Sequence, residues 1–116
     1  MKYEVTTAPI ADTDLAHVFD FLFESHLSFG YNSSSAFTAA VKRIEKIKRH
    51  MRALGKAPHQ GTLQPKLGPH MRVVTKERAV FYFEVDDAAK CVRVLAVFFG
   101  AQDHQRAMLK RALGGG

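Results

Sequence analysis

The chain has 116 residues, 47% of them hydrophobic, and its 17 lysines and arginines against 11 aspartates and glutamates give a formal net charge of +6. This composition is too apolar for a disordered chain. The length predicts a single domain over residues 1–113, with a flexible tail at 114–116. No apolar run reaches the roughly 18 residues of a membrane span and no leader is recognisable, so we expect a cytoplasmic protein that does not enter a membrane. The excess of positive charge favours an acidic partner, either a phosphate backbone or an acidic protein segment.

The first half of the chain is predicted to contain a strand and two helices. Residues 2–7 alternate polar and apolar side chains, which is typical of a short strand. Between residues 9 and 28, and again between residues 35 and 54, apolar side chains recur at spacings of three and four, which predicts two amphipathic helices. The second helix is basic on its other face. Because only about four residues separate the helices, they should form an antiparallel hairpin whose apolar stripes lie on a sheet.

The second half is predicted to be mainly β-structure. Residues 55–70 hold three of the four prolines and are expected to form a loop. Strands follow at 71–75, 79–85 and 91–99, with separators short enough for hairpins, and the middle strand is apolar enough to be central. Asp103 can cap a last short helix. The predicted fold class is α+β, with an N-terminal strand, a helical hairpin packed on an antiparallel sheet of about four strands, and a short C-terminal helix.

Motifs for metal, nucleotide and nucleophile chemistry are missing from the sequence. The six histidines include no pair at a spacing of three or four, so no metal site is expected. No glycine-rich loop follows a strand and opens a helix, and no serine lies in a tight elbow between a strand and a helix. We therefore expect no cofactor, and we interpret the lone Cys91 as a buried, inert thiol.

Acid and base catalysis on RNA is one function that the residues leave open. Cleavage by an internal 2′-hydroxyl needs a base, an acid and a cation beside the phosphate. The side chains able to provide these groups are Arg72, Arg78, Tyr82 and His104. The alternative interpretation, which we prefer, is that they are charged and polar groups at the rim of a basic sheet.

Particular residues, in a particular order, resemble a known family over essentially the whole chain. They are Tyr3-Glu-Val-Thr, Asp14-Leu15, Ile44 with Ile47, residues 68–72, Phe81-Tyr-Phe-Glu-Val85 and residues 92–104. In this order they resemble the ParE branch of the RelE/ParE superfamily of type II toxins. The resemblance implies a toxin, encoded beside an antitoxin whose C-terminal segment wraps and neutralises it in a hetero-oligomer.

The chain departs from the ribosome-dependent mRNA endonucleases of that superfamily, which carry arginines on the sheet and a late arginine and tyrosine as catalytic groups. In this chain, Ala101 and Gln102 occupy the position of the late arginine, and Met108 or Leu109 occupies the position of the tyrosine. Val80 occupies the position of an arginine in the middle strand. The resemblance thus favours a non-enzymatic toxin that binds DNA gyrase. An mRNA endonuclease that acts at the ribosome with a different residue set is the first alternative, and a basic nucleic-acid-binding module is the second.

Two surfaces are predicted to make the contacts of such a toxin. The candidates for binding the target are Arg72, Arg78, Arg93, Gln102, His104 and Arg106. The candidates for binding the antitoxin belong to the apolar stripes of the two helices: Leu15, Phe19, Phe23, Val41 and Ile44.

Overall fold

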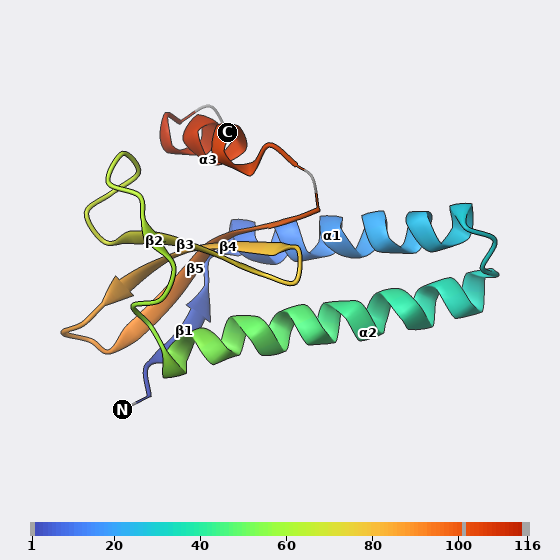
Figure 1. The fold of residues 1–116 in the computed structure, drawn as a ribbon, viewed down its shortest axis with the longest axis horizontal. Helices are drawn as coiled ribbons and strands as arrows, with labels where there is room; N and C mark the ends of the chain where they lie inside the picture. Colours follow the sequence, from blue (N-terminus) through green and yellow to red (C-terminus); the bar gives the residue numbers. More distant parts are fainter. Residues whose placement is uncertain (1, 101, 115–116) are drawn as a thin grey trace.

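Two long helices dominate the computed structural model, which describes residues 2–100 and 102–114. Helix α1 (Pro9–Ser28) and helix α2 (Ser33–Arg52) run antiparallel and extend well beyond the sheet at the end where they are joined (Figure 1). Pro9 suits the first turn of α1, where a backbone N–H has no helical partner. Asn32 begins α2, because its side-chain oxygen accepts a hydrogen bond of 2.8 Å from the Ser35 N–H. The predicted helical hairpin is confirmed.

Five strands form one mixed sheet. They are β1 (Glu4–Thr7), β2 (Thr62–Leu63), β3 (Met71–Lys76), β4 (Ala79–Asp86) and β5 (Cys91–Phe99). The spatial order is β1-β5-β4-β3-β2, and β3, β4 and β5 are joined by antiparallel hairpins as predicted.

The sheet differs from the predicted antiparallel sheet of about four strands in two respects. Strand β1 runs parallel to β5, and the two-residue strand β2 adds an edge beside β3. Two parallel strands need a long connection between them. Along the chain, the whole helical hairpin separates β1 from the other strands of the sheet. The short helix η1 (Ala53–Lys56) fixes the position of β1, because the Tyr3 N–H donates to the Gly55 carbonyl at 2.8 Å. The local alternation of polar and apolar residues cannot predict either pairing, because both join residues that are far apart in the sequence.

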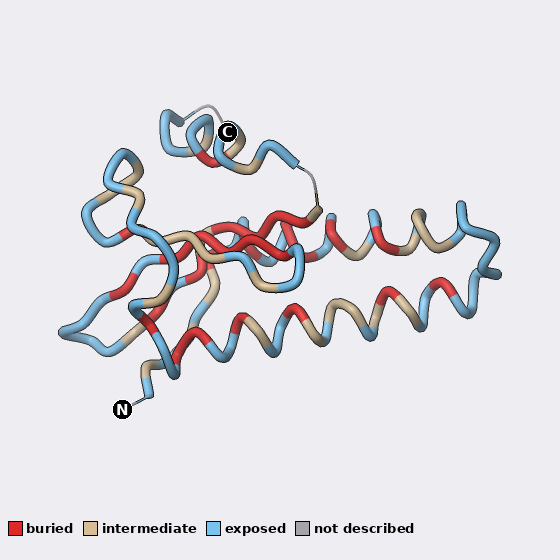
Figure 2. Tube along the Cα trace, viewed as in Figure 1, coloured by how far each residue is buried: buried red, intermediate tan, exposed pale blue. Residues whose placement is uncertain are grey.

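The two faces of the sheet carry separate apolar clusters. Phe81 and Phe83 of β4 point toward α1 and α2 and are fully buried there. Tyr82, between them, lies on the other face in a second cluster with Met108 of helix α3 (His104–Ala112). Figure 2 shows the resulting buried strands at the centre of the molecule. The predicted central place of the middle strand is confirmed.

The C-terminal helix begins where the sequence predicts. The Asp103 carboxylate accepts a hydrogen bond from the Arg106 N–H at 3.2 Å and caps α3. Ala101 and residues 115–116 lie outside the described residues, and the domain limits and the flexible tail stay predictions. Among the residues that the structure describes, no helix is long and apolar enough to cross a membrane.

Candidate functional site

The four residues considered for RNA cleavage lie in two separate places. The Tyr82 hydroxyl and His104 Nδ1 are 2.8 Å apart beneath α3, on the sheet face opposite the helical hairpin. Burial, and to a lesser degree the charge of Asp103, raises the pKa of the Tyr82 hydroxyl. Arg72 donates to the His59 carbonyl at 2.7 Å, and the Arg78 guanidinium lies 5.2 Å from the ring centre of Phe99, which packs on the helical side. The structure thus brings Tyr82 and His104 together but separates them from both arginines.

Arg78 is held in place by a tight turn between β3 and β4. Glu77 and Arg78 have φ angles of 49° and 73°, a left-handed conformation that residues other than glycine and asparagine adopt at a cost. Helix α2 stabilises the turn through three basic side chains. Arg43 donates to the Glu77 carbonyl at 2.8 Å, while Lys46 and His50 reach the Glu77 carboxylate at 3.1 and 2.7 Å. One side of α2 therefore fixes the direction of Arg78.

Acid should loosen this turn. The hydrogen bond from His50, followed by that from Lys46, lowers the pKa of Glu77 below its usual value of 4.5. A carboxylate whose pKa is lowered by folding stabilises the fold above its unfolded pKa, and this contribution is lost as the pH falls through the folded pKa. We expect Glu77→Gln to lower the free energy of unfolding at pH 7, as measured by urea unfolding. At a pH below the folded pKa of Glu77, the variant and the parent chain should have the same free energy of unfolding. Glu24→Gln, a change of the same kind on the exposed side of α1, is the control, and an equal pH dependence of both variants would contradict the assignment.

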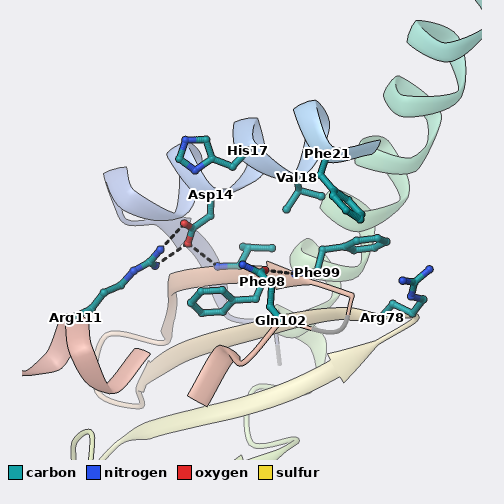
Figure 3. Close-up of a pocket in the computed structure, with 10 residues that line it drawn as sticks. Asp14, His17, Val18, Phe21, Arg78, Phe98, Phe99, Gln102 and Arg111 are labelled. Atoms are coloured by element: carbon teal, nitrogen blue, oxygen red, sulfur yellow. Dashed lines mark hydrogen bonds and ion pairs between the residues drawn. The ribbon is translucent and has the colours of Figure 1, made fainter. Parts of the chain in front are cut away.

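A groove begins beside this turn, where the helical hairpin extends past the end of the sheet. One hollow of about 530 Å³ lies between α1, the end of β5 and α3 (Figure 3). A second hollow of about 730 Å³ continues between α1 and α2. Phe21, Arg78 and Phe99 line both hollows, so the two adjoin, and together they are called the groove below.

A buried ion pair closes the α3 end of the groove. Asp14 of α1 accepts hydrogen bonds of 2.9 and 2.7 Å from the two terminal nitrogens of Arg111, and a third of 3.0 Å from the Val97 N–H. The Asp14 carboxylate raises the pKa of the Arg111 guanidinium. Because the guanidinium also lies 4.9 Å from the ring centre of Phe98, α3 is attached to both α1 and β5.

The remaining target-binding candidates are dispersed. Gln102 lines the groove and accepts from the Phe99 N–H at 3.1 Å. Arg93 is opposite Glu84 on the neighbouring strand and lines another hollow, near the turn between β4 and β5. Arg106 is exposed on α3. Only Arg78 and Gln102 of the six predicted residues therefore lie on the groove.

The antitoxin-binding candidates mostly face inward. Leu15 is buried in the core between helices and sheet, and Phe19, Phe23 and Ile44 pack against that core. Val41 is partly buried. The apolar stripes of the two helices thus pack against the sheet in this structure, so four of these five side chains belong to the core or pack against it.

The groove was not predicted as a unit, because the aromatic side chains that line it lie off the apolar stripes. Phe21 is on the flank of α1 and is 51% exposed, and Phe99 is the last residue of its strand. Asp14 did carry a signal, since a carboxylate four residues before the buried Val18 lies on the inward stripe and needs a partner there. Its partner Arg111 lies 97 residues away in the sequence.

Metal ligands do not gather at the groove. Within residues 2–100 and 102–114, no three His, Cys, Asp or Glu side chains come together in a way that could hold a metal ion. The groove combines cationic and aromatic side chains, which suits binding to an anionic and partly apolar partner.

Comparison with solved structures identifies the fold. No family model matches the chain, and no curated protein matches it. The RelBE2 toxin–antitoxin complex of Mycobacterium tuberculosis matches with a TM-score of 0.62 and 14% identity, over 88% of this chain and 95% of that one. A chromosomal ParDE system from P. aeruginosa matches with a TM-score of 0.61 and 20% identity, over 84% and 96%. The chain has the RelE/ParE fold.

A third structure extends this fold across almost the whole chain. A mutant of the E. coli toxin RelE in the free state matches with a TM-score of 0.57 and 14% identity, over 96% of this chain and 98% of that one. The fold of this chain therefore matches toxins of type II toxin–antitoxin systems from both the RelE and the ParE branches.

Proposed function

We propose that this chain is the toxin of a type II toxin–antitoxin pair and that it arrests growth by binding DNA gyrase, as ParE-like toxins are expected to do. The RelE/ParE fold supports the toxin role. The matched structures include complexes with antitoxins, which supports a cognate antitoxin as the partner of this chain.

One observation favours binding over RNA cleavage. The face of the sheet where Tyr82 and His104 meet is apolar, with Val80 and Met108 buried beside Tyr82 in the same cluster. The two arginines that would have to neutralise a phosphate contact His59 and Phe99 instead. A phosphorane formed beside Tyr82 and His104 would lack the cationic stabilisation expected from these two arginines, which disfavours general acid and base cleavage of RNA by this set of residues.

The alternative function, a ribosome-dependent mRNA endonuclease, retains one specific observation in its favour. The 2.8 Å contact between Tyr82 and His104 joins two groups that can exchange a proton. If the chain cleaved mRNA, His104→Ala would lower the cleavage rate by about 100-fold or more, the usual contribution of a general acid or base.

Induced expression of the chain alone is the test of the toxin role. We expect growth to stop within a few generations and to resume when the protein encoded by the adjacent reading frame is produced. Normal growth on expression of the folded chain would contradict the proposal and favour a basic nucleic-acid-binding module.

A further inference from the structure

The end of the helical hairpin that extends past the sheet carries exposed aromatic rings (Figure 1). This hairpin tip, residues 25–41, comprises the last turn of α1, the connection to α2 and the first turns of α2. Phe29 is 82% exposed, Phe37 55% and Tyr31 47%. Phe29 also lines the groove, whereas Tyr31 and Phe37 line neither of its two hollows. The groove therefore does not account for the exposure of Tyr31 and Phe37.

The hairpin tip also lacks charged side chains. Although 24% of the chain consists of charged residues, none of the residues 25–41 is Asp, Glu, Lys or Arg. The first cation beyond the tip, Lys42, lies about 14 Å along α2 from Ser33. On a chain with a net charge of +6, an uncharged end with three exposed aromatic rings indicates an interaction site.

The backbone of the tip is fixed by its own hydrogen bonds. The N–H groups of Phe29 and Tyr31 both donate to the His26 carbonyl, at 3.2 and 3.1 Å. Gly30 lies between them with a φ angle of 95°, a conformation that glycine adopts without strain. The Tyr31 ring is edge-on to the His26 ring, with 4.9 Å between the ring centres. The tip is thus ordered before a partner binds, which lowers the entropic cost of binding.

The absence of charge disfavours several kinds of partner. Nucleic acids are bound by aromatic rings together with cations that contact the phosphates, and anchors at anionic membranes also carry basic side chains. The groove of a second copy is rimmed by cations of α2 and by Arg78, and the tip has no carboxylate to pair with them. Two tips in contact would each bury roughly 400 Å², about half of the area per partner in a typical stable interface.

We propose that the hairpin tip inserts into an apolar, uncharged cleft on the protein target of this chain, with Tyr31 and Phe37 as anchor side chains. The inference rests on the proposed function, in which DNA gyrase is that target. Aromatic side chains that fill a pocket of a partner contribute much of the affinity of larger interfaces, so a small tip is sufficient as an anchor.

The experiment compares the inhibition of gyrase supercoiling by the parent chain and by the variant Tyr31→Ser with Phe37→Ser. Neither residue lines the groove, so the groove keeps its side chains in this variant. We expect half-inhibition to need about 100-fold more of the variant than of the parent, with each lost ring contributing about tenfold. Because the lost contact is apolar, the same factor is expected at low and at physiological ionic strength.

The matched control is Ile10→Ser with Leu63→Ser. These side chains are 41% and 48% exposed and belong to the first turn of α1 and to β2, away from the tip. We expect the control to change the half-inhibiting concentration by no more than about twofold, as for surface side chains outside an interface. Should the test variant lose cooperative unfolding, Tyr31→Ser against Leu63→Ser replaces it, with about tenfold weakening expected.

Three outcomes would overturn the inference: equal loss of inhibition in test and control variants, undiminished inhibition by the test variant, or a loss that disappears as the ionic strength rises. The other occupants are tested by sedimentation velocity of the chain, by vesicles of anionic lipid and by a DNA duplex without gyrase. Self-association or binding to either probe that requires Tyr31 and Phe37 would also overturn it.

The parent chain separates this inference from the proposed function. If parent and test variant both inhibit gyrase equally, the proposed function stands and the tip loses its role. If the parent arrests growth without inhibiting gyrase, gyrase is not the target, and growth decides the role of the tip. Arrest by the control but not by the test variant would then support insertion into another protein, and arrest by both would overturn it. A parent chain that neither inhibits gyrase nor arrests growth removes both proposals.

Discussion

Replacing Asp14 with alanine is expected to lower the free energy of unfolding by about 3 kcal/mol, because it removes one partner of a buried ion pair and the acceptor of a buried N–H. The Asp14 carboxylate is 6% exposed and accepts from both terminal nitrogens of Arg111 and from Val97. The Arg111 side chain is 23% exposed and regains some contact with water, which keeps the loss below that of a fully buried pair. Urea unfolding at neutral pH measures the change.

The matched control for this prediction is Asp20→Ala, an exposed aspartate on the same helix. It should change stability by less than about 0.5 kcal/mol, as surface substitutions generally do. If the two variants were equally stable, α3 would not be anchored through Asp14, and the α3 end of the groove would have to be held in another way.

Replacing Phe81 with alanine is expected to lower the free energy of unfolding by about 4 kcal/mol, because it leaves a cavity beneath the helical hairpin that the surrounding side chains cannot fill. Phe81 is fully buried on β4, where it is opposite Val74 of β3 and Val97 of β5. This is a large share of the roughly 5–15 kcal/mol that stabilises a domain. Chemical unfolding at neutral pH measures this loss.

Phe37→Ala is the matched control for the core prediction. Phe37 of α2 is 55% exposed and has an edge contact with Phe19, so removal of its ring should cost about 1 kcal/mol or less. If the two substitutions lowered the free energy of unfolding equally, the helical hairpin would not pack on Phe81 as described above.

The parts of the fold that depend on neighbouring residues were predictable from the sequence. The spacing of apolar side chains in α1 and α2 reflects the face that each helix buries, and the short separators at residues 77–78 and 87–90 allow only hairpins between β3, β4 and β5. The parallel pairing of β1 with β5 was not predictable, because it joins Glu4 to Cys91 and depends on where the whole helical hairpin ends.

The groove was not predictable for a similar reason. The sequence shows that Arg43 lies on a basic helical face, but not that Arg43 shares the ring of Phe99 with Arg78. The positive φ angles at Glu77 and Arg78 are also hidden, since neither residue is glycine or asparagine and the contacts from Arg43, Lys46 and His50 offset the strain. Interactions among helix α2, this turn and the end of β5 become visible only in three dimensions.

The proposed binding of this chain to DNA gyrase is tested most directly by adding the purified chain to gyrase, relaxed plasmid and ATP. We expect supercoiling to be inhibited and DNA to accumulate in the cleaved form, with mRNA on ribosomes left intact in a parallel reaction. Unchanged supercoiling together with mRNA cleavage at the ribosomal A site would contradict the proposed binding to gyrase and assign the chain to the endonucleases.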